Sequence, residues 1–167
     1  MTIRAVFNRK YESYTPGGVE VYLVNGAGVT TSLPTSQTFT AGTSLIQGDA
    51  VFVSGTFVFP ANAASGVDST NYSVIGITAQ AAPSASGVAV ILDSVATISS
   101  ANLAGDTQLV PGVYYYLSKF AGKITRFSTA SGLITAASGY AALVNLGLAL
   151  SPSELQIEIE VPLALYN

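Results

Sequence analysis

Short runs of strand-forming residues, each ended by turn residues, restrict the fold of this chain more than any other feature of its sequence. Val, Ile, Thr, Tyr and Phe cluster in these runs, while Gly, Pro, Asn, Asp and Ser separate them. The sequence therefore predicts an all-β fold, a compact β-sandwich or barrel-like domain with an N-terminal arm. The predicted strands are 2–7, 19–24, 50–59, 73–79, 88–98, 113–118, 122–127, 142–150 and 154–161.

The strand pattern is clearest in the segment 154–161. Apolar residues alternate there with Glu and Gln, which predicts a strand with one buried face and one acidic face. The apolar positions are Leu155, Ile157, Ile159 and Val161.

Two parts of the chain look like weak copies of each other. The Gly-Asp pair at 48–49 recurs at 105–106, an offset of 57, and a later strand-turn-strand unit aligns Gly76 with Gly147, an offset of 71. A true repeat predicts two related half-sheets that close a sandwich or barrel, with the two Gly-Asp pairs in equivalent turns. A chance match of common residues is the alternative.

The first part of the chain differs from the rest. Three of the six basic residues lie within the first ten positions, and a Ser/Thr-rich stretch follows at 29–44. So short a segment has little core of its own, so we predict that residues 1–47 form an attachment arm that packs on a neighbour. Residues 48–167 are predicted to form the β-domain.

Charge is scarce in this chain, at 9% of the residues. No Lys or Arg occurs between Tyr11 and Ser118. A monomer of 17.1 kDa exposes roughly 7,800 Å² of surface, and its fifteen charged residues would give about one charge for every 500 Å². Charge-free areas of that size approach the ~800 Å² that each partner buries in a standard interface. The sequence therefore predicts a homo-oligomer; a monomer solvated by Ser, Thr, Asn and Gln is the alternative.

Composition also argues against several classes of function. A net charge of -3 with six Lys and Arg provides no phosphate-binding footprint for nucleic acid. The most apolar stretch, 141–150, is far shorter than the ~20 residues of a membrane span, and the N-terminus does not resemble a signal peptide.

Catalytic patterns are missing from the sequence. The chain has no Cys and no His, and it has no phosphate-binding or calcium-loop motif. Glu158 and Glu160 share one strand face, but such a pair is more typical of a solvated surface than of a catalytic site. We therefore expect no enzymatic activity, no cofactor and no metal.

Aromatic and basic residues near the centre of the second copy are the remaining candidates for recognition. Tyr114, Tyr115 and Tyr116 are consecutive, so at least one ring points away from the core of a strand. Such a ring can stack on a sugar or anchor a protein interface, whereas packing within the sheet is the alternative. The basic residues after this run are Lys119, Lys123 and Arg126, and they predict a small basic knob.

Four motifs carry a resemblance to a known group of proteins. They are GDAVFVSG (48–55), VIGITAQAAPSASGVAVILDSVATI (74–98), GDTQLVPGVYYYLSKFAGKITR (105–126) and LGLALSPSELQIEIEVPLAL (146–165). In this order they resemble phage virion proteins of the capsid decoration, or cement, and head-fibre type. Similar modules occur in phage tail fibres and baseplate-associated proteins.

The resemblance implies a β-rich, usually homotrimeric structural protein that is made in the host cytoplasm and binds the outside of the phage capsid. Its partner would be the major capsid protein, and Arg4, Arg9 and Lys10 would contact acidic residues of that shell. The main alternative is a tail-fibre or baseplate adhesion module that binds host glycans through Tyr114, Tyr115 and Tyr116. A subunit of a bacterial surface layer or appendage is a third possibility.

Overall fold

The computed structural model describes residues 5–7, 21–24, 30–31, 36–129 and 132–165, and the side chains of 36–127 and 134–165. Regular structure in these residues is almost entirely β, which confirms the predicted all-β, barrel-containing fold. The helical segments among them are single 3-10 turns: η2 (Ser69–Tyr72), η3 (Ser100–Asn102) and η4 (Ala136–Ser138). Within the described chain, no helix is long and apolar enough to cross a membrane.

Three strands precede the compact part of the chain. They are β1 (Ala5–Phe7), β2 (Val21–Val24) and β3 (Thr30–Thr31), and they pair antiparallel in the order β1-β2-β3. The three residues predicted to contact a capsid, Arg4, Arg9 and Lys10, lie outside the described residues.

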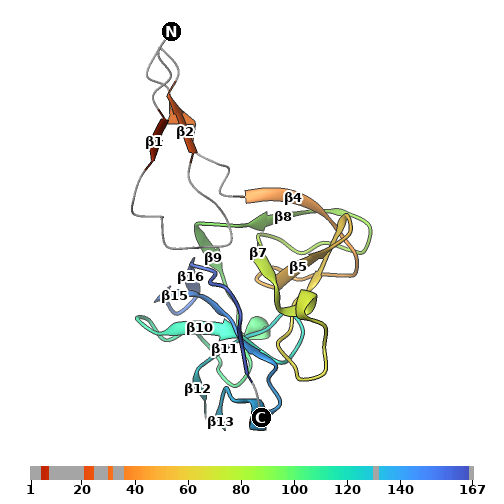
Figure 1. Ribbon diagram of the computed structural model, residues 1–167, viewed down its shortest axis with the longest axis vertical. Helices are drawn as coiled ribbons and strands as arrows, with labels where there is room; N and C mark the ends of the chain where they lie inside the picture. Colours follow the sequence, from red (N-terminus) through yellow and green to blue (C-terminus); the bar gives the residue numbers. More distant parts are fainter. Residues whose placement is uncertain (1–4, 8–20, 25–29, 32–35, 130–131, 166–167) are drawn as a thin grey trace.

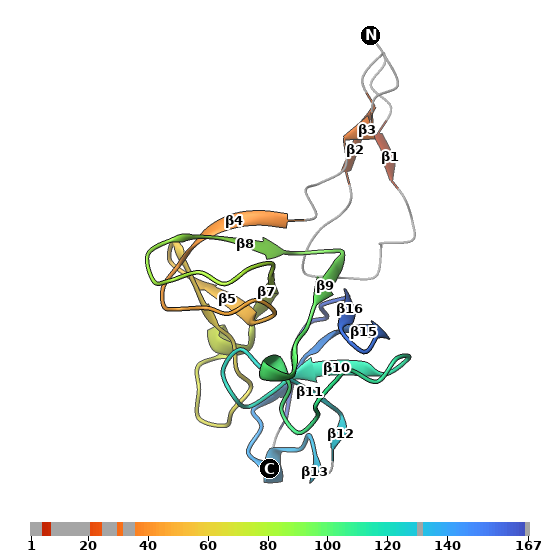
Figure 2. The same cartoon turned by 180° about the vertical axis from the view of Figure 1, so that it is seen from behind.

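The first barrel closes through its first strand. Its strand order is β4-β6-β5-β7-β8, and β4 pairs antiparallel with β8 and parallel with β6. Figures 1 and 2 show these strands gathered in one half of the compact region. The strands are β4 (Ser36–Ala41), β5 (Ala50–Ser54), β6 (Phe57–Pro60), β7 (Val74–Thr78) and β8 (Gly87–Ile91). A buried apolar cluster contains Ala41, Leu45, Val51, Val58, Ala82, Val88 and Val90.

A second five-stranded sheet follows, with the order β11-β10-β15-β16-β9 (Figure 1). Leu103, after β9, forms a parallel bridge with Ile124 in β11, so this sheet also returns on itself and we call it the second barrel. Its strands are β9 (Val95–Thr97), β10 (Tyr114–Leu117), β11 (Ile124–Arg126), β15 (Asn145–Ser151) and β16 (Glu154–Ile157). Two small pairs accompany it: β12 (Ser128–Thr129) with β13 (Gly132–Leu133), and β14 (Ala142–Leu143) with β17 (Leu163–Ala164).

The two barrels repeat one strand arrangement. In chain order, β4, β5, β6, β7 and β8 correspond to β9, β10, β11, β15 and β16, and all four strand pairs of the second sheet have counterparts in the first barrel. The parallel closure is also shared, because Ala41 pairs with Val58 in the first barrel and Leu103 pairs with Ile124 in the second. The internal repeat predicted from the sequence is therefore present.

A glycine occupies the same place in each copy. Gly76 pairs with Val51 and Gly147 pairs with Tyr115, and in both pairs the register shifts at the next residue. A Cβ on Gly76 would lie 2.3 Å from the carbonyl oxygen of Ile91, and one on Gly147 would lie 1.9 Å from a backbone oxygen of the neighbouring strand. Only glycine allows the backbones to approach so closely, and the predicted alignment of these two glycines is confirmed.

The predicted alignment of the two Gly-Asp pairs is wrong. Gly48 donates its N–H to the oxygen of Thr78 at 2.9 Å, and Gly112 donates in the same way to Ala149 at 2.8 Å. Gly48 therefore corresponds to Gly112 and not to Gly105. The loop before β10 is longer than the loop before β5, and sequence comparison alone placed the short motif on the wrong side of this insertion.

The barrel begins earlier in the chain than the sequence suggested. Residues 36–41, which were grouped with the arm 1–47, form β4, and Leu45 is buried in the first barrel. The β-domain therefore includes residues 36–47. The Ser/Thr-rich composition of this segment obscured the strand because its outward positions are exposed and polar.

Three predicted strands also differ in extent. The segment 50–59 contains two strands because Gly55, with φ of 62°, turns the chain between β5 and β6. The segment 88–98 bends at 92–94 and yields β8 and β9. The alternation in 154–161 holds through Ile157, where β16 ends, and Val161 is 59% exposed.

Apolar packing continues from one barrel to the other. Ala50, Phe52 and Ile77 of the first barrel belong to the same buried cluster as Leu103 and Leu117 of the second. The junction between the barrels is therefore part of the hydrophobic core.

Candidate protein-binding surface

The three consecutive tyrosines have different environments. Tyr115 is fully buried in the second barrel, and its hydroxyl accepts a hydrogen bond from the N–H of Val110 at 3.0 Å. Burial raises the pKa of this hydroxyl above its ordinary value. Tyr115 is therefore a core residue, and its assignment to surface recognition is corrected.

The two neighbours of Tyr115 point to the opposite side of the strand, as the period of a β-strand requires. Tyr114 is 45% exposed, whereas Tyr116 is half-buried and its ring packs edge-on against Phe127 at 6.0 Å between centroids. Of the predicted run, Tyr114 is the ring most available to a partner.

Two of the three basic residues after this run, Lys119 and Arg126, have separate partners within the chain. Arg126 makes a two-point ion pair with Asp106, in which Nε lies 2.8 Å from Oδ2, and this hydrogen bonding raises the pKa of Arg126. Lys119 donates from Nζ to the carbonyl oxygen of Ser138 at 2.9 Å and lies 5.7 Å from the ring centre of Tyr140. These contacts hold loops of the second barrel in place.

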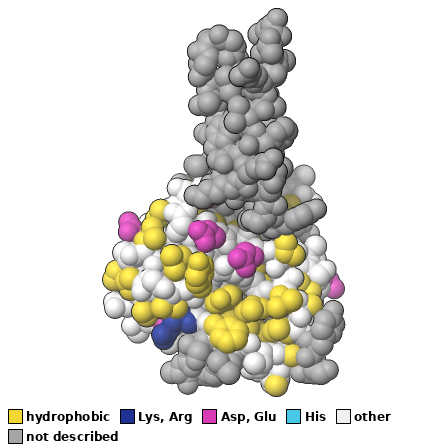
Figure 3. Space-filling view, turned by 60° about the vertical axis from the view of Figure 1, so that its left-hand side comes forward, with side chains coloured by type: hydrophobic (Ala, Val, Ile, Leu, Met, Phe, Trp, Pro, Cys, Tyr) yellow, Lys and Arg dark blue, Asp and Glu magenta, His cyan; other side chains and the backbone are white. Residues whose placement is uncertain are grey.

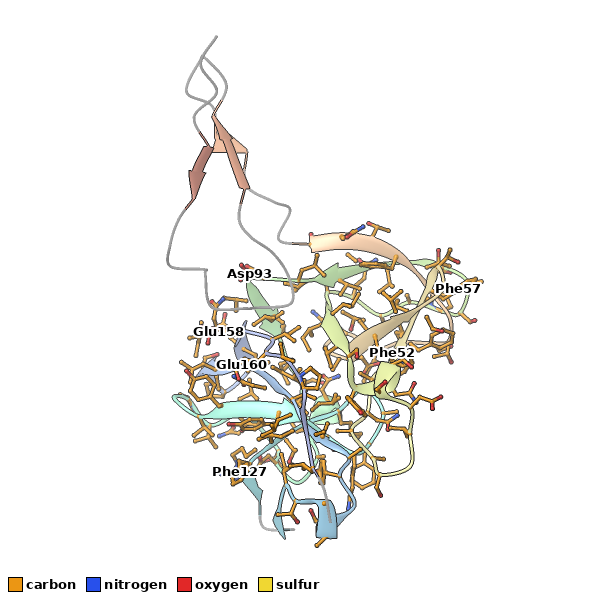
Figure 4. All side chains as sticks on the ribbon, viewed as in Figure 1. Phe52, Phe57, Asp93, Phe127, Glu158 and Glu160 are labelled. Atoms are coloured by element: carbon orange, nitrogen blue, oxygen red, sulfur yellow. The ribbon has the colours of Figure 1, made fainter. Side chains whose placement is uncertain are left out.

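Acidic side chains gather on one side of the second barrel. Asp93, Glu158 and Glu160 are exposed and lie on the side of β9 and β16 (Figure 4). Among the described residues, no group of three or more His, Cys, Asp or Glu side chains could hold a metal ion.

The most buried carboxylate of the described chain lies at the junction of the barrels. Asp49, 8% exposed, accepts the N–H of Ile46 at 2.9 Å on Oδ2 and the side-chain N–H of Asn102 at 3.3 Å on Oδ1. Burial raises the pKa of Asp49, while these hydrogen bonds and nearby Lys123 oppose that rise. Because its partners come from both copies, this group acts as a structural joint.

A row of outward-facing side chains crosses four strands of the second barrel. Tyr114 of β10 pairs with Leu148 of β15, Leu148 pairs with Gln156 of β16, and Gln156 pairs with Val95 of β9. Tyr114 and Val95 are 45% and 40% exposed, and Leu150, farther along β15, is 50% exposed. We call these five residues the outer face of the second barrel.

Charge borders the outer face on β16, because Glu154 lies two residues from Gln156 on the same side of the strand and is exposed. Figure 3 shows hydrophobic side chains gathered on the side of the molecule that includes these strands, with acidic groups above them. Exposed apolar side chains gathered on one side of a protein mark candidate sites of association with another protein. Tyr114 was predicted from the sequence, whereas Val95, Leu148 and Leu150 were not, although they alternate along their strands with the buried residues Ala96 and Ala149.

A shallow hollow also lies at the junction of the two copies. It is lined by Ile46, Gln47, Thr97, Ser99 and Ala101. None of these side chains titrates or is a strong nucleophile, so the hollow offers no catalytic groups.

No protein-family model matches this chain, and no curated protein sequence matches it.

Proposed function

We propose that this protein is a structural component of a phage virion, a decoration or head-fibre protein that binds the outer surface of the capsid as a homotrimer. It performs no chemical step. The proposal combines the sequence resemblance with one structural observation, the exposed apolar side chains of Tyr114, Val95 and Leu150 on the outer face of the second barrel. An exposed aromatic ring beside aliphatic side chains is typical of a surface that binds another protein.

The predicted mechanism is mass action. A protein that binds the assembled shell more tightly than it binds loose subunits stabilises the shell by RT ln(1 + [L]/Kd), about 2.7 kcal/mol when its concentration is 100 times Kd. The segment that precedes β4 provides the contact with the shell, and Arg4, Arg9 and Lys10 supply positive charge for acidic groups of the major capsid protein.

The alternative is a tail-fibre or baseplate adhesion module, in which the exposed ring of Tyr114 would stack on a sugar. Burial of Tyr115 leaves this module fewer free rings for stacking on a sugar than the sequence suggested. The homotrimeric decoration protein is therefore the function we favour.

The test is to mix the purified protein with undecorated heads and to image the particles by electron microscopy. We expect density at symmetric positions on the capsid, and deletion of residues 1–12 should abolish it while the β-domain stays folded. Binding to tails without binding to heads would contradict the proposal. Binding to a glycan array that is lost in Tyr114→Ala would favour the adhesion module instead.

A further inference from the structure

The outer face of the second barrel has a counterpart in the first barrel. Ala50 pairs with Ile77, and Ile77 pairs with Ile91, across β5, β7 and β8. Tyr114, Leu148 and Gln156 occupy the same places across β10, β15 and β16. The same surface of the module therefore occurs twice in the chain.

In the first barrel this surface is covered. Ala50 and Ile77 are fully buried in the core cluster that continues into the second barrel, and Ile91 packs against it. Ala50 also donates its N–H to the carbonyl oxygen of Gly122, in the loop between β10 and β11, at 3.0 Å. One copy of the module thus uses this face to bind the next copy along the chain.

In the second barrel the corresponding surface is exposed at Tyr114 and at Val95. We propose that a second copy of this protein covers it. The first barrel of that copy would pack on the outer face of the second barrel, as the second barrel packs on the first within one chain. The inference refines the self-association contained in the proposed function by assigning its contact surfaces.

The repeat also indicates which part of the second copy makes the contact. Within one chain, the loop between β10 and β11 contacts the covered face, and the corresponding loop of the first barrel joins β5 to β6. Phe57, at the end of that turn, is 41% exposed. In Figure 4, Phe57 lies at the far side of the first barrel from β10, β15 and β16, so one molecule cannot bring the two surfaces together.

Charge supports a second copy as the occupant. The first barrel has no Lys or Arg, and residues 36–91 contain two acids, Asp49, which is buried, and Asp68. An almost uncharged barrel can cover the apolar side chains of the outer face without burying a charge of its own. Since the two surfaces differ, the contact is head to tail, and such contacts build a closed ring, as a trimer requires, or an open filament.

The experiment uses two complementary variants of the full chain. Tyr114→Glu places a charge on the outer face, and Phe57→Asp places one on the β5–β6 turn. We expect each variant alone to scatter light as a monomer of 17.1 kDa at micromolar concentration, with self-association at least tenfold weaker than in the wild type. An equimolar mixture should form dimers of twice that mass, because one intact surface of each kind remains.

Controls separate this result from misfolding and from other interfaces. Val95→Glu and Thr56→Glu repeat the test at other exposed positions of the outer face and of the β5–β6 turn. Urea unfolding verifies that each variant is folded. Phe120→Glu, which places a charge at an exposed position outside the two proposed surfaces, should keep the wild-type mass. A monomeric wild type overturns the inference. Wild-type mass in Phe57→Asp, or a mixture that stays monomeric, also overturns it, since either result shows that the two surfaces do not meet. This light-scattering experiment contains no phage heads. Failure of the protein to bind heads is therefore measured separately and contradicts only the proposed function.

Discussion

Asn102 donates a side-chain hydrogen bond to the carboxylate of Asp49 at 3.3 Å, and this contact joins the two barrels. Asn102 is fully buried, and its own side-chain oxygen accepts the N–H of Ser99 at 3.1 Å. The pair therefore links the loop before β5 to the 3-10 turn after β9.

Removing this link should destabilise the whole protein. Asn102→Ala leaves a buried carboxylate oxygen and the N–H of Ser99 without their partner, and we expect a loss of about 2 kcal/mol in the free energy of unfolding. Urea unfolding measures the loss. Ser100→Ala, at an exposed position of the same turn, should change it by less than ~0.5 kcal/mol. Equal effects of the two substitutions would show that the Asp49 contact contributes nothing.

The raised pKa of Asp49 makes stability depend on pH. Because this pKa is higher in the folded protein than the ~3.9 of an unfolded aspartate, the folded state binds the proton more tightly. The resulting stability is fully present below the unfolded pKa and is lost as the pH rises through the folded pKa. The stability of the wild type relative to Asp49→Asn should therefore fall as the pH rises from 3, as measured by urea unfolding at constant ionic strength. A difference that stays constant or increases would contradict the assignment.

Gly147 should tolerate no side chain. In Gly147→Ala, the new Cβ would lie 1.9 Å from the oxygen of Gln156, and the strands β15 and β16 would have to separate. We expect a loss of more than about 4 kcal/mol, seen in thermal unfolding or as failure to fold. Gly66→Ala is the matched control, because its φ is also positive but its Cβ meets no atom within 4 Å, so it should cost about 1–2 kcal/mol. Similar losses in both variants would argue against the close approach of the strands.

Substitutions of Tyr115 and Tyr114 should have different effects on the free energy of unfolding. Tyr115→Phe removes the acceptor of the Val110 N–H and should cost about 1 kcal/mol. The hydroxyl of Tyr114 lies on an exposed ring, so Tyr114→Phe should change stability by less than ~0.5 kcal/mol. Urea unfolding of the two variants measures the difference, and a larger effect at Tyr114 would reverse the assignment of core and surface.

The sequence by itself determined the all-β class, the repeat and most of the strand centres. Strand-forming runs and turn residues act over a few neighbours, so they can be read along the chain, and the alternation around Tyr115 showed that one side of that strand had to be buried. The equivalence of Gly76 and Gly147 was likewise visible, because the two glycines align in two similar strand-turn-strand segments.

Only the tertiary structure decided which side of each strand is covered and by what. Alternation distinguishes two faces but does not say that Ala50 lies under the second barrel while its counterpart Tyr114 is exposed. The barrel closure between β4 and β6, the position of Asp106 beside Arg126 and the joint between Asp49 and Asn102 all depend on contacts between residues distant in sequence. Such contacts leave no local pattern, because their partners are chosen by packing and loop length and not by neighbouring residues.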